Sequence, residues 1–347
     1  MGQHQILILA GNSPGKKLLT GKSFFQVMNE DPDLMFDDQC IVSQRGNKNS
    51  VDPQKPYGWI VEQERTIKGK IEETGIIFLT NRECPFHCLM CDLWKNTTDE
   101  PVALGAIPHQ IEWALEQMPE IKHLKLYNSG SFFDTKAVPE ADYKKIASLL
   151  KNFETVIVES HPKLINERCL HFRDMLKPEL HIAVGLETIH PEILRKLNKQ
   201  MTLEDFSNSI GYLTKYGITS RAFILLRPPF LSESESIYWA EQSIDFAFNA
   251  GVECCTVIPV RAGNGAMDYL LEKGDFNLPD IHSLETVLEY GIGLKKGRVF
   301  ADIWDLGLFS KCNKCIDQRT NRLINMNLRQ KIVSQINCTC DSPKANN

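Results

Sequence analysis

The 347-residue sequence has no long hydrophobic run and no excess of basic charge. No apolar stretch approaches the roughly 20 residues that a membrane-spanning helix needs. Residues 1–10 lack the positive start and the long apolar segment of a secretory signal, and Ile6 stands where a myristoylation signal has Ser or Thr. The formal net charge is −5, so composition gives no support for nonspecific nucleic-acid binding. We therefore expect a cytoplasmic protein with no membrane span.

A disulfide framework is also not expected. The chain has 11 cysteines, but without an export signal they indicate reduced thiols and metal ligation. Hydrophobic residues at 42% and charged residues at 24% are ordinary for a globular protein, and the length allows one large domain or two smaller ones. The pattern along the chain predicts an N-terminal extension over 1–70, a core over 71–270 and a cysteine-containing C-terminal segment over 271–347.

Three cysteines form the most informative motif. Cys84, Cys88 and Cys91 are spaced C-x3-C-x2-C, directly after the apolar run 75–80. That run predicts a short buried strand, so the thiols lie on the loop at its C-terminal end, where open α/β folds place their chemistry. The loop lacks a fourth cysteine. Three thiolates can bind three irons of a [4Fe-4S] cube and leave the fourth iron to a small molecule.

Two other interpretations of this loop stay open. A zinc site usually has two C-x2-C pairs or a mixed Cys/His set, which one triple fits poorly. His87 lies inside the loop, but turning it inward beside its neighbours would be sterically awkward. The second interpretation is that buried cysteines have clustered by chance.

Short apolar runs alternate with helical patterns from residue 75 onward. This alternation is typical of a parallel α/β sheet or barrel, and six repeats predict a partial (β/α)6 TIM-like barrel, open on one side. Strand C-terminal ends then form one face, as in complete barrels. The predicted strands are 76–80, 123–127, 155–159, 181–187, 222–226 and 254–259. The predicted helices lie near 108–118, 139–151, 163–175, 190–197, 203–216, 235–250 and, in the C-terminal segment, 281–294.

The cysteine loop resembles the signature of the radical S-adenosylmethionine (SAM) superfamily, with Met90 where an aromatic residue is commonest. The stretches 185–188, 197–202 and 223–229 are similar to the module shared by Elongator-type, methylthiotransferase and oxygen-independent coproporphyrinogen dehydrogenase enzymes. The resemblance implies that SAM chelates the open iron and is cleaved to a 5′-deoxyadenosyl radical, with the electron supplied by a donor such as flavodoxin or ferredoxin. The protein's own task is to position and shield that radical.

The same resemblance implies which residues contact SAM. Ser129, Gly130 and Ser131 occupy the place of a Gly-rich turn that binds the SAM amino group through its backbone. Glu159, Glu187 and Lys199 match acidic and basic SAM contacts. As alternatives, the turn is a plain βα turn, the acids serve in salt bridges or helix caps, and the lysine lies at a solvated helix end.

Two further groups of residues lie at later strand ends. Asn264 and Gly265 follow the last predicted strand, in a region that lies beside adenine in the family. Arg227 and Arg261 are candidates to contact an anionic substrate or the SAM carboxylate. Either arginine could instead hold Glu159 or Glu187.

Four cysteines near the C-terminus form two close pairs. Cys312 with Cys315, and Cys338 with Cys340, supply four soft ligands, enough for zinc or for a second iron–sulfur cluster. The alternative is a set of unligated thiols in a loose tail.

The nearest more specific resemblance is to the radical SAM lyase subunit of archaeosine synthesis, a tRNA-modifying enzyme. It rests on the stretches 129–134, 159–162 and 183–188 and extends over roughly 75–265. Three functions stay open: a radical SAM enzyme acting on a small molecule or lipid precursor, a tRNA-base-modifying enzyme, which the acidic balance does not favour, and a noncatalytic iron–sulfur electron carrier.

Overall fold

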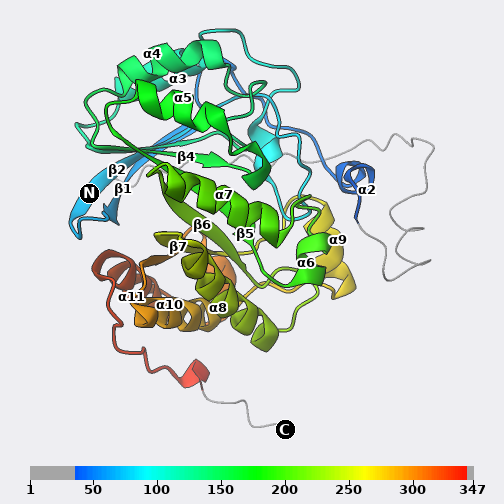
Figure 1. The fold of residues 1–347 in the computed structure, drawn as a ribbon. Coiled ribbons are helices and arrows are strands. Elements are labelled where there is room, and N and C mark those ends of the chain that lie inside the picture. Colours follow the sequence, from blue (N-terminus) through cyan, green and yellow to red (C-terminus); the bar gives the residue numbers. More distant parts are fainter. Residues whose placement is uncertain (1–35, 342–347) are drawn as a thin grey trace. The chain divides into compact units, whose positions relative to one another are not determined.

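One eight-stranded sheet organises the part of the chain that the computed structural model describes, residues 36–341. The strands follow one another in chain order, and the sheet curls into a partial barrel (Figure 1). β1 is antiparallel to β2, and every later neighbour pair is parallel. The strands are β1 (Gly58–Arg65), β2 (Ile71–Phe78), β3 (His123–Tyr127), β4 (Thr155–Ser160), β5 (Glu179–Glu187), β6 (Thr219–Leu226), β7 (Cys254–Pro259) and β8 (Arg298–Ala301). The predicted partial TIM-like barrel is confirmed.

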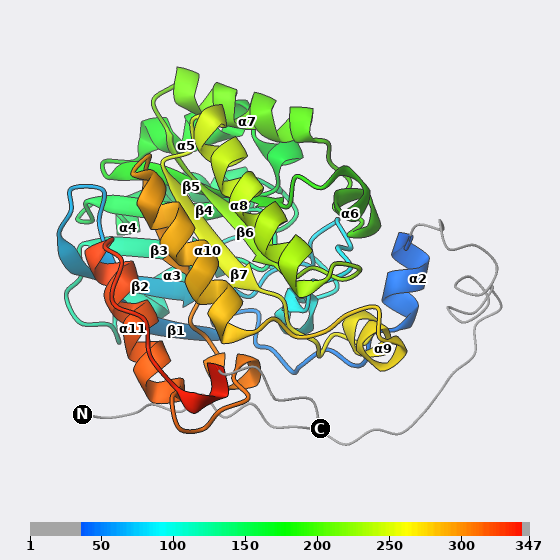
Figure 2. The same ribbon diagram turned by 90° about the horizontal axis from the view of Figure 1, so that it is seen from below.

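Helices connect the parallel strands and cover the outer face of the sheet, as Figure 2 shows. They are α2 (Asp38–Ser43), α3 (Ala106–Leu115), α4 (Tyr143–Leu149), α5 (Glu167–Met175), α6 (Pro191–Lys196), α7 (Leu203–Lys215), α8 (Glu233–Ala250), α9 (Ala266–Lys273), α10 (Ile281–Leu294) and α11 (Ile316–Arg329). Short 3-10 turns lie at Leu93–Asn96, Glu140–Asp142, Pro162–Leu164, Leu306–Phe309 and Thr339–Asp341. Within residues 36–341, every helix is too short or too polar to cross a bilayer.

The core lies between the sheet and its helices. Alternate strand residues point outward into it, because successive side chains of a strand face opposite sides. These outward residues are fully or almost fully buried and apolar: Ile77, Leu124, Leu126, Val156, Val158, Ile182, Val184, Ala222, Ile224, Cys255, Val257 and Val299. The opposite positions face the barrel interior, where polar residues such as Lys125 and Arg221 occur.

The sheet is longer than the sequence predicts. All six predicted strands are present, but β2 begins at Ile71, five residues before the predicted start. Ile71 is followed by two glutamates, Glu72 and Glu73, which pair with β1 at an edge of the sheet, where one face reaches water. β1 and β8 were not predicted, since β1 is rich in glutamate and β8 has only four residues. The division into segments at 70 and 270 stays a prediction, and residues 1–35 of the first segment lie outside the described part.

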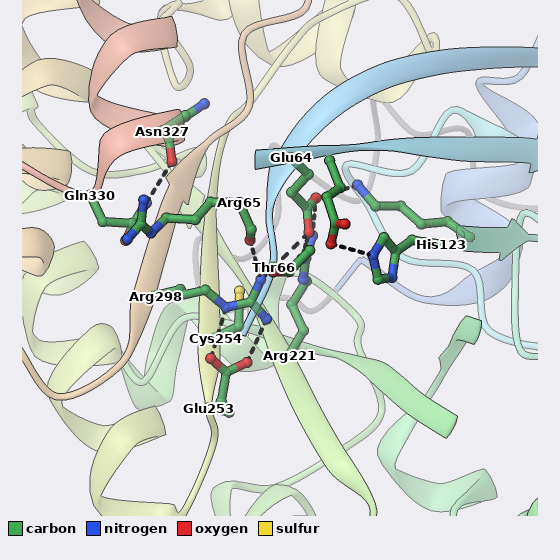
Figure 3. Close-up of polar contacts among 12 residues, drawn as sticks. Glu64, Arg65, Thr66, His123, Arg221, Glu253, Cys254, Arg298, Asn327 and Gln330 are labelled. Atoms are coloured by element: carbon green, nitrogen blue, oxygen red, sulfur yellow. Dashed lines mark hydrogen bonds and ion pairs between the residues drawn. The ribbon is translucent and has the colours of Figure 1, made fainter. Parts of the chain in front are cut away.

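A buried ionic network fills the amino-terminal end of the barrel interior (Figure 3). Glu64 of β1 accepts hydrogen bonds from Lys125 of β3 and Arg221 of β6, each at 2.5 Å. Arg298 of β8 lies 3.8 Å from the Glu64 carboxylate and pairs with Glu253 at 2.6 Å. Burial alone would raise the pKa of Glu64, but the charges of Arg221 and Lys125 outweigh it and hold that pKa far below its usual range. We call these five residues the Glu64 network.

The two ends of the sheet meet at this network. Arg298 donates from Nη1 to the backbone oxygen of Arg65 at 2.5 Å, which ties β8 to β1. Two side-chain amides, from the last turn of α11 and the residue after it, cover the free edge of β8. Gln330 exchanges two hydrogen bonds of 2.8 Å with the backbone of Val299, and Asn327 exchanges two of 2.9 Å with Ala301. These amides replace the partner strand that an edge would otherwise lack.

Candidate functional site

The three-cysteine loop leaves the carboxyl end of β2, as predicted from the sequence. The buried side-chain amide of Gln110 on α3 accepts from the Thr80 backbone at 2.8 Å and donates to its oxygen at 2.7 Å, which fixes the start of the loop. The base is closed by two backbone hydrogen bonds, from Glu83 to Thr98 and from Thr98 to Asn81. The cysteines therefore lie on a loop with both ends anchored.

The thiols of Cys84, Cys88 and Cys91 are electrostatically coupled. Burial raises the pKa of each to about 12, and each feels the negative charge of at least one of the other two. Lys199 opposes the shift at Cys84 and Cys88. Cys88 is buried, and Cys84 and Cys91 are half-buried. Thiols that resist ionisation in such surroundings suit a cationic cofactor, because iron would compensate the thiolate charges that the surroundings do not. The donor set therefore fits an iron–sulfur cluster.

Two asparagines hold the cysteine loop in place. Asn198, after α6, donates to the His87 oxygen at 2.9 Å, and Asn264, before α9, donates to the oxygens of Leu89 at 2.7 Å and Cys91 at 3.0 Å. Asn264 was predicted to lie beside adenine, and its side-chain amide serves to anchor the loop. Asn198 was not singled out from the sequence, because nothing local indicates a contact 111 residues away.

Two histidines near the loop have partners of their own. His87 lies 3.2 Å from a carboxylate oxygen of Asp38 and 3.6 Å from one of Glu83. His161 stacks on Phe86 with ring centroids 3.7 Å apart. Its Nδ1 accepts from the Lys163 N–H and its Nε2 lies 2.8 Å from the Lys199 oxygen, so Nε2 carries the proton. His161 is thus hydrogen-bonded to neighbouring residues of the chain, and His87 lies beside two carboxylates.

Glu159 at the end of β4 lies beneath the turn that follows β3. Its Oε1 accepts from the backbone N–H of Asn128 at 2.6 Å and of Gly130 at 3.4 Å. Burial raises the pKa of Glu159 to about 7, and these backbone donors offset the shift in part. A Cβ added to Gly130 would lie 3.2 Å from Cβ of Cys84, so this turn passes directly beside the cluster loop. The predicted residues at 129–131 and Glu159 are brought together.

The side chains of that turn are also in use. Ser131 accepts from the backbone N–H of His161 at 2.7 Å, and the hydroxyl of Ser129 lies 3.1 Å from that of Tyr57. Asn128 is different: its side chain is 0% exposed, and neither its amide nitrogen nor its oxygen has a hydrogen-bond partner among the described residues. A buried amide without partners indicates a ligand that is polar on at least one side. The sequence shows Asn128 at a strand end, a signal that the prediction did not use.

Glu187 and Lys199 form a buried ion pair at the end of β5, with Nζ and Oε1 2.7 Å apart. The register of β5 against β6 shifts between Gly185 and Glu187, and this bulge turns the Glu187 side chain toward the lysine. A Cβ at Gly185 would lie only 2.4 Å from the Glu187 carboxylate and 2.5 Å from Nζ, so glycine leaves the space that the pair occupies. The two predicted residues therefore act together.

Backbone conformation also marks the strand ends. Ser129, Glu187 and Arg227 are non-glycine residues with φ of 53°, 66° and 56°. Such left-handed residues cost about 1–3 kcal/mol each and cluster at functional sites. All three had been predicted as site residues.

The two predicted substrate arginines have acidic partners in the second half of the chain. Arg227 pairs with Glu233 and donates to the Leu278 oxygen at 2.7 Å. Arg261 lies 3.2 Å from Asp302 and donates to the Trp304 oxygen at 2.6 Å. The structure pairs them with these acids rather than with Glu159 or Glu187, and their contact with a substrate stays a prediction.

The segment 36–50 packs against the cluster loop. Asp38 of α2 accepts from Asn198 at 2.7 Å, and Arg45 pairs with Glu83 at 2.5 Å while lying over the Trp94 ring. α2 lies beside α9 in both ribbon views (Figures 1 and 2), and a Cβ at Gly265 would collide with the Gln44 oxygen at 1.9 Å. The predicted extension thus contributes to the surroundings of the cysteines.

The C-terminal cysteines are brought together as well. The sulfur atoms of Cys312, Cys315, Cys338 and Cys340 all lie within 4.8 Å of one another, so this group can bind a metal. The backbone N–H groups of Lys314 and Cys315 point at the Cys312 sulfur and lower the pKa of that thiol to about 6.

Comparison with known proteins gives relatives for most of the chain. No family model matches it. An uncharacterized protein of Methanocaldococcus jannaschii, MJ0550, is 30% identical over 315 residues, which cover 83% of this chain and 86% of that protein. The archaeosine synthase subunit beta of Methanosarcina acetivorans is 31% identical over 216 residues, 58% of this chain and 60% of the subunit.

Solved structures with a similar arrangement are more distant. Methanocaldococcus infernus Elp3 gives a TM-score of 0.48 at 13% identity, over 64% of this chain and 58% of Elp3. Escherichia coli coproporphyrinogen III oxidase (HemN), a radical SAM enzyme, gives 0.43 at 13% identity, over 75% of this chain and 56% of HemN. The chain therefore belongs to one family with the M. jannaschii protein.

Proposed function

We propose that this protein is an enzyme that binds a [4Fe-4S] cluster through Cys84, Cys88 and Cys91 and reductively cleaves SAM. The observation that carries the proposal is the position of these three cysteines, one buried and two half-buried, on the loop at the carboxyl end of β2, where the unpartnered Asn128 amide and the Glu187–Lys199 pair also lie. A cluster with SAM on its open iron would supply the electron that breaks a carbon–sulfur bond and gives methionine and a 5′-deoxyadenosyl radical.

The chain's own residues bind and orient SAM in this proposal. The carboxylate of Glu159, once ionised, attracts the positive charge of SAM, and its backbone donors hold it in one orientation. Glu187 and Lys199 offer one charge of each sign beside the cysteines. The unpartnered amide of Asn128 can both donate and accept, as ribose hydroxyls or the methionine part of SAM require.

Anaerobic assay tests the proposal directly. The reconstituted, cluster-replete protein is reduced in the presence of SAM, and 5′-deoxyadenosine is quantified. We expect the product with the wild-type chain and none with Cys88→Ala. No product from a cluster-replete sample under several reductants would contradict catalysis and favour the third function, a noncatalytic electron carrier.

Two substrate classes remain in the proposal. The first is a small molecule or lipid precursor, which a net charge of −5 leaves open. The second is a tRNA base, favoured by the 31% identity to an archaeosine synthase subunit. Retention of RNA by protein purified at low salt, with RNA-dependent formation of 5′-deoxyadenosine, would support the second class; RNA-independent turnover with small-molecule extracts would support the first.

The remaining parts of the proposal concern partners. The electron would come from a reduced flavodoxin or ferredoxin, and we place the protein in the cytoplasm. A metal at the C-terminal cysteines, either zinc or a second iron–sulfur cluster, completes the expected cofactors.

A further inference from the structure

The four C-terminal sulfurs are spaced for one metal ion. Cys312 and Cys338 have their sulfurs 3.8 Å apart, and Cys315 and Cys340 3.6 Å apart. A tetrahedral ion with metal–sulfur bonds of about 2.3 Å places its ligands about 3.8 Å from one another. In an iron–sulfur cube each thiolate binds a different iron, so the sulfurs must lie farther apart. The compact group therefore fits a single ion and is too tight for a cube.

We infer that these four cysteines bind one zinc ion, and that the ion fastens the C-terminal strap, residues 330–341, to the start of α11. The inference narrows the proposed C-terminal metal and is independent of SAM cleavage. Four thiolates close the coordination sphere, which is the arrangement of structural rather than catalytic zinc.

A buried arginine links the cysteine group to its surroundings. Arg319 on α11 donates to the Cys315 sulfur at 3.4 Å, pairs with Glu285 of α10 at 2.5 Å and donates to the Ile336 oxygen at 3.3 Å. It therefore contacts one ligand, the neighbouring helix and the strap that carries two of the other three ligands. A positive group next to a sulfur offsets the excess negative charge of a tetrathiolate zinc site.

A second buried arginine repeats the arrangement one turn later. Arg322 donates to the oxygens of Val333 and Ser334 and pairs with Glu289 at 2.5 Å. The strap is thus already aligned along α11 by its backbone oxygens, and the sulfurs meet at its far end. An ion at that point closes a long loop between Cys315 and Cys338, where a metal clip removes the most chain freedom.

The proposed zinc site is connected to the barrel on both sides. Asn327 in the last turn of α11 and Gln330 directly after it occupy the free edge of β8. On the other side of Cys312, Phe309 lies beneath the Arg261 guanidinium at the carboxyl end of the barrel. Zinc would therefore stabilise both the last strand and the segment beneath a predicted substrate residue.

Metal analysis of the full chain tests the inference. Protein purified anaerobically is analysed for zinc and iron by mass spectrometry, as wild type, as Cys338→Ser/Cys340→Ser and as Cys88→Ala. We expect about one zinc per wild-type chain. The double variant should lose zinc and keep its iron, whereas Cys88→Ala should lose iron and keep zinc. Cys40→Ser, at a cysteine of neither group, is the control and should keep both.

A second measurement uses the wild-type protein, so it tests the zinc site even if the double variant fails to fold. Wild-type protein grown with cobalt in place of zinc should show the visible absorption of a tetrahedral cobalt tetrathiolate. Hydrogen exchange should also quicken in α11 and β8 when a mercurial reagent releases the metal.

Three outcomes would overturn the inference: iron in place of zinc at this group, an iron content that falls by a whole cluster in the double variant, or a disulfide between these cysteines in freshly isolated protein. Loss of SAM cleavage without loss of zinc would contradict the proposed function alone.

Discussion

The two ends of the barrel differ in how completely their buried polar groups are satisfied. At the amino end, Glu64 is satisfied by Lys125 and Arg221, and Arg298 by Glu253. At the carboxyl end, Glu187 is paired with Lys199, but the side chain of Asn128 has no partner among the described residues, and Glu159 has backbone donors without a hydrogen-bonded cation among them. A buried polar group without a hydrogen-bond partner lowers the stability of the fold. The unpartnered amide at the carboxyl end therefore indicates a ligand, whereas the paired charges at the amino end stabilise the fold.

The largest effect should come from Cys88→Ala at the carboxyl end. Removing one of three ligands should abolish both the iron and the formation of 5′-deoxyadenosine, because the other two thiols cannot hold the cluster alone. The free energy of unfolding of the metal-free chain should fall by only about 1 kcal/mol. Iron analysis, product assay and denaturant unfolding check this, with Cys40→Ser as the control. Iron that is retained in Cys88→Ala would contradict a cluster held by these three cysteines.

Glu64→Gln should reverse that pattern at the amino end. The substitution leaves Lys125 and Arg221 buried without their shared carboxylate, and breaking a buried ion pair typically costs about 3–5 kcal/mol. SAM cleavage by the folded fraction should stay close to wild type. Denaturant unfolding measures the loss, and Glu62→Gln is the matched control because Glu62 lies on the same strand and contacts the same lysine from a more exposed position. Equal losses in both variants would argue against the Glu64 network.

Asn128→Ala sharpens the comparison with a smaller change. The amide has no partner to lose, so stability should hardly change, whereas affinity for SAM should fall about tenfold, or about 1.4 kcal/mol, as for one good hydrogen bond. Equilibrium binding of SAM to the cluster-replete protein measures this. Ser131→Ala is the comparison, since its hydroxyl already serves His161. A clear loss of stability without a loss of affinity would contradict a ligand role for Asn128.

The smallest effect is a pH dependence at Glu159. Because burial raises the pKa of Glu159 to about 7, a large part of the carboxyl is protonated at pH 6 and little at pH 8. SAM is positively charged and should bind the ionised form better, so affinity should rise as pH increases through 7 and then level off. Glu159→Gln should bind more weakly and lose that rise. An unchanged pH profile in the variant would assign the titration to another group.

Most of the fold and the cysteine motif could be predicted from local sequence patterns. The apolar run before Cys84 and the spacing of the cysteines lie within one short stretch, so the loop and its position could be predicted from sequence. The partners of Arg227 and Arg261 could not, because Glu233 and Asp302 become neighbours only when α8 and the segment after β8 pack into place. The grouping of Cys312 with Cys338 was one of two alternatives in the sequence, because the paired spacing indicates a metal site without showing that α11 brings the two pairs together.

The two edge strands of the sheet, β1 and β8, were also not predicted from the sequence. β1 carries glutamates because one of them serves an interior network, so its composition does not follow the alternation typical of a half-buried strand. β8 is short because α11 amides, and not a further strand, complete it.

The bond from Arg298 to the backbone of Arg65 has a consequence for biosynthesis. It joins residues 233 positions apart, so the ribosome must extend the chain well beyond β8 before the two ends of the sheet can engage. Until then, β7 presents an unprotected edge to the crowded interior of the cell. Chaperone demand should therefore peak late in translation, and truncations that end before α11 should accumulate as aggregates rather than as smaller folded barrels.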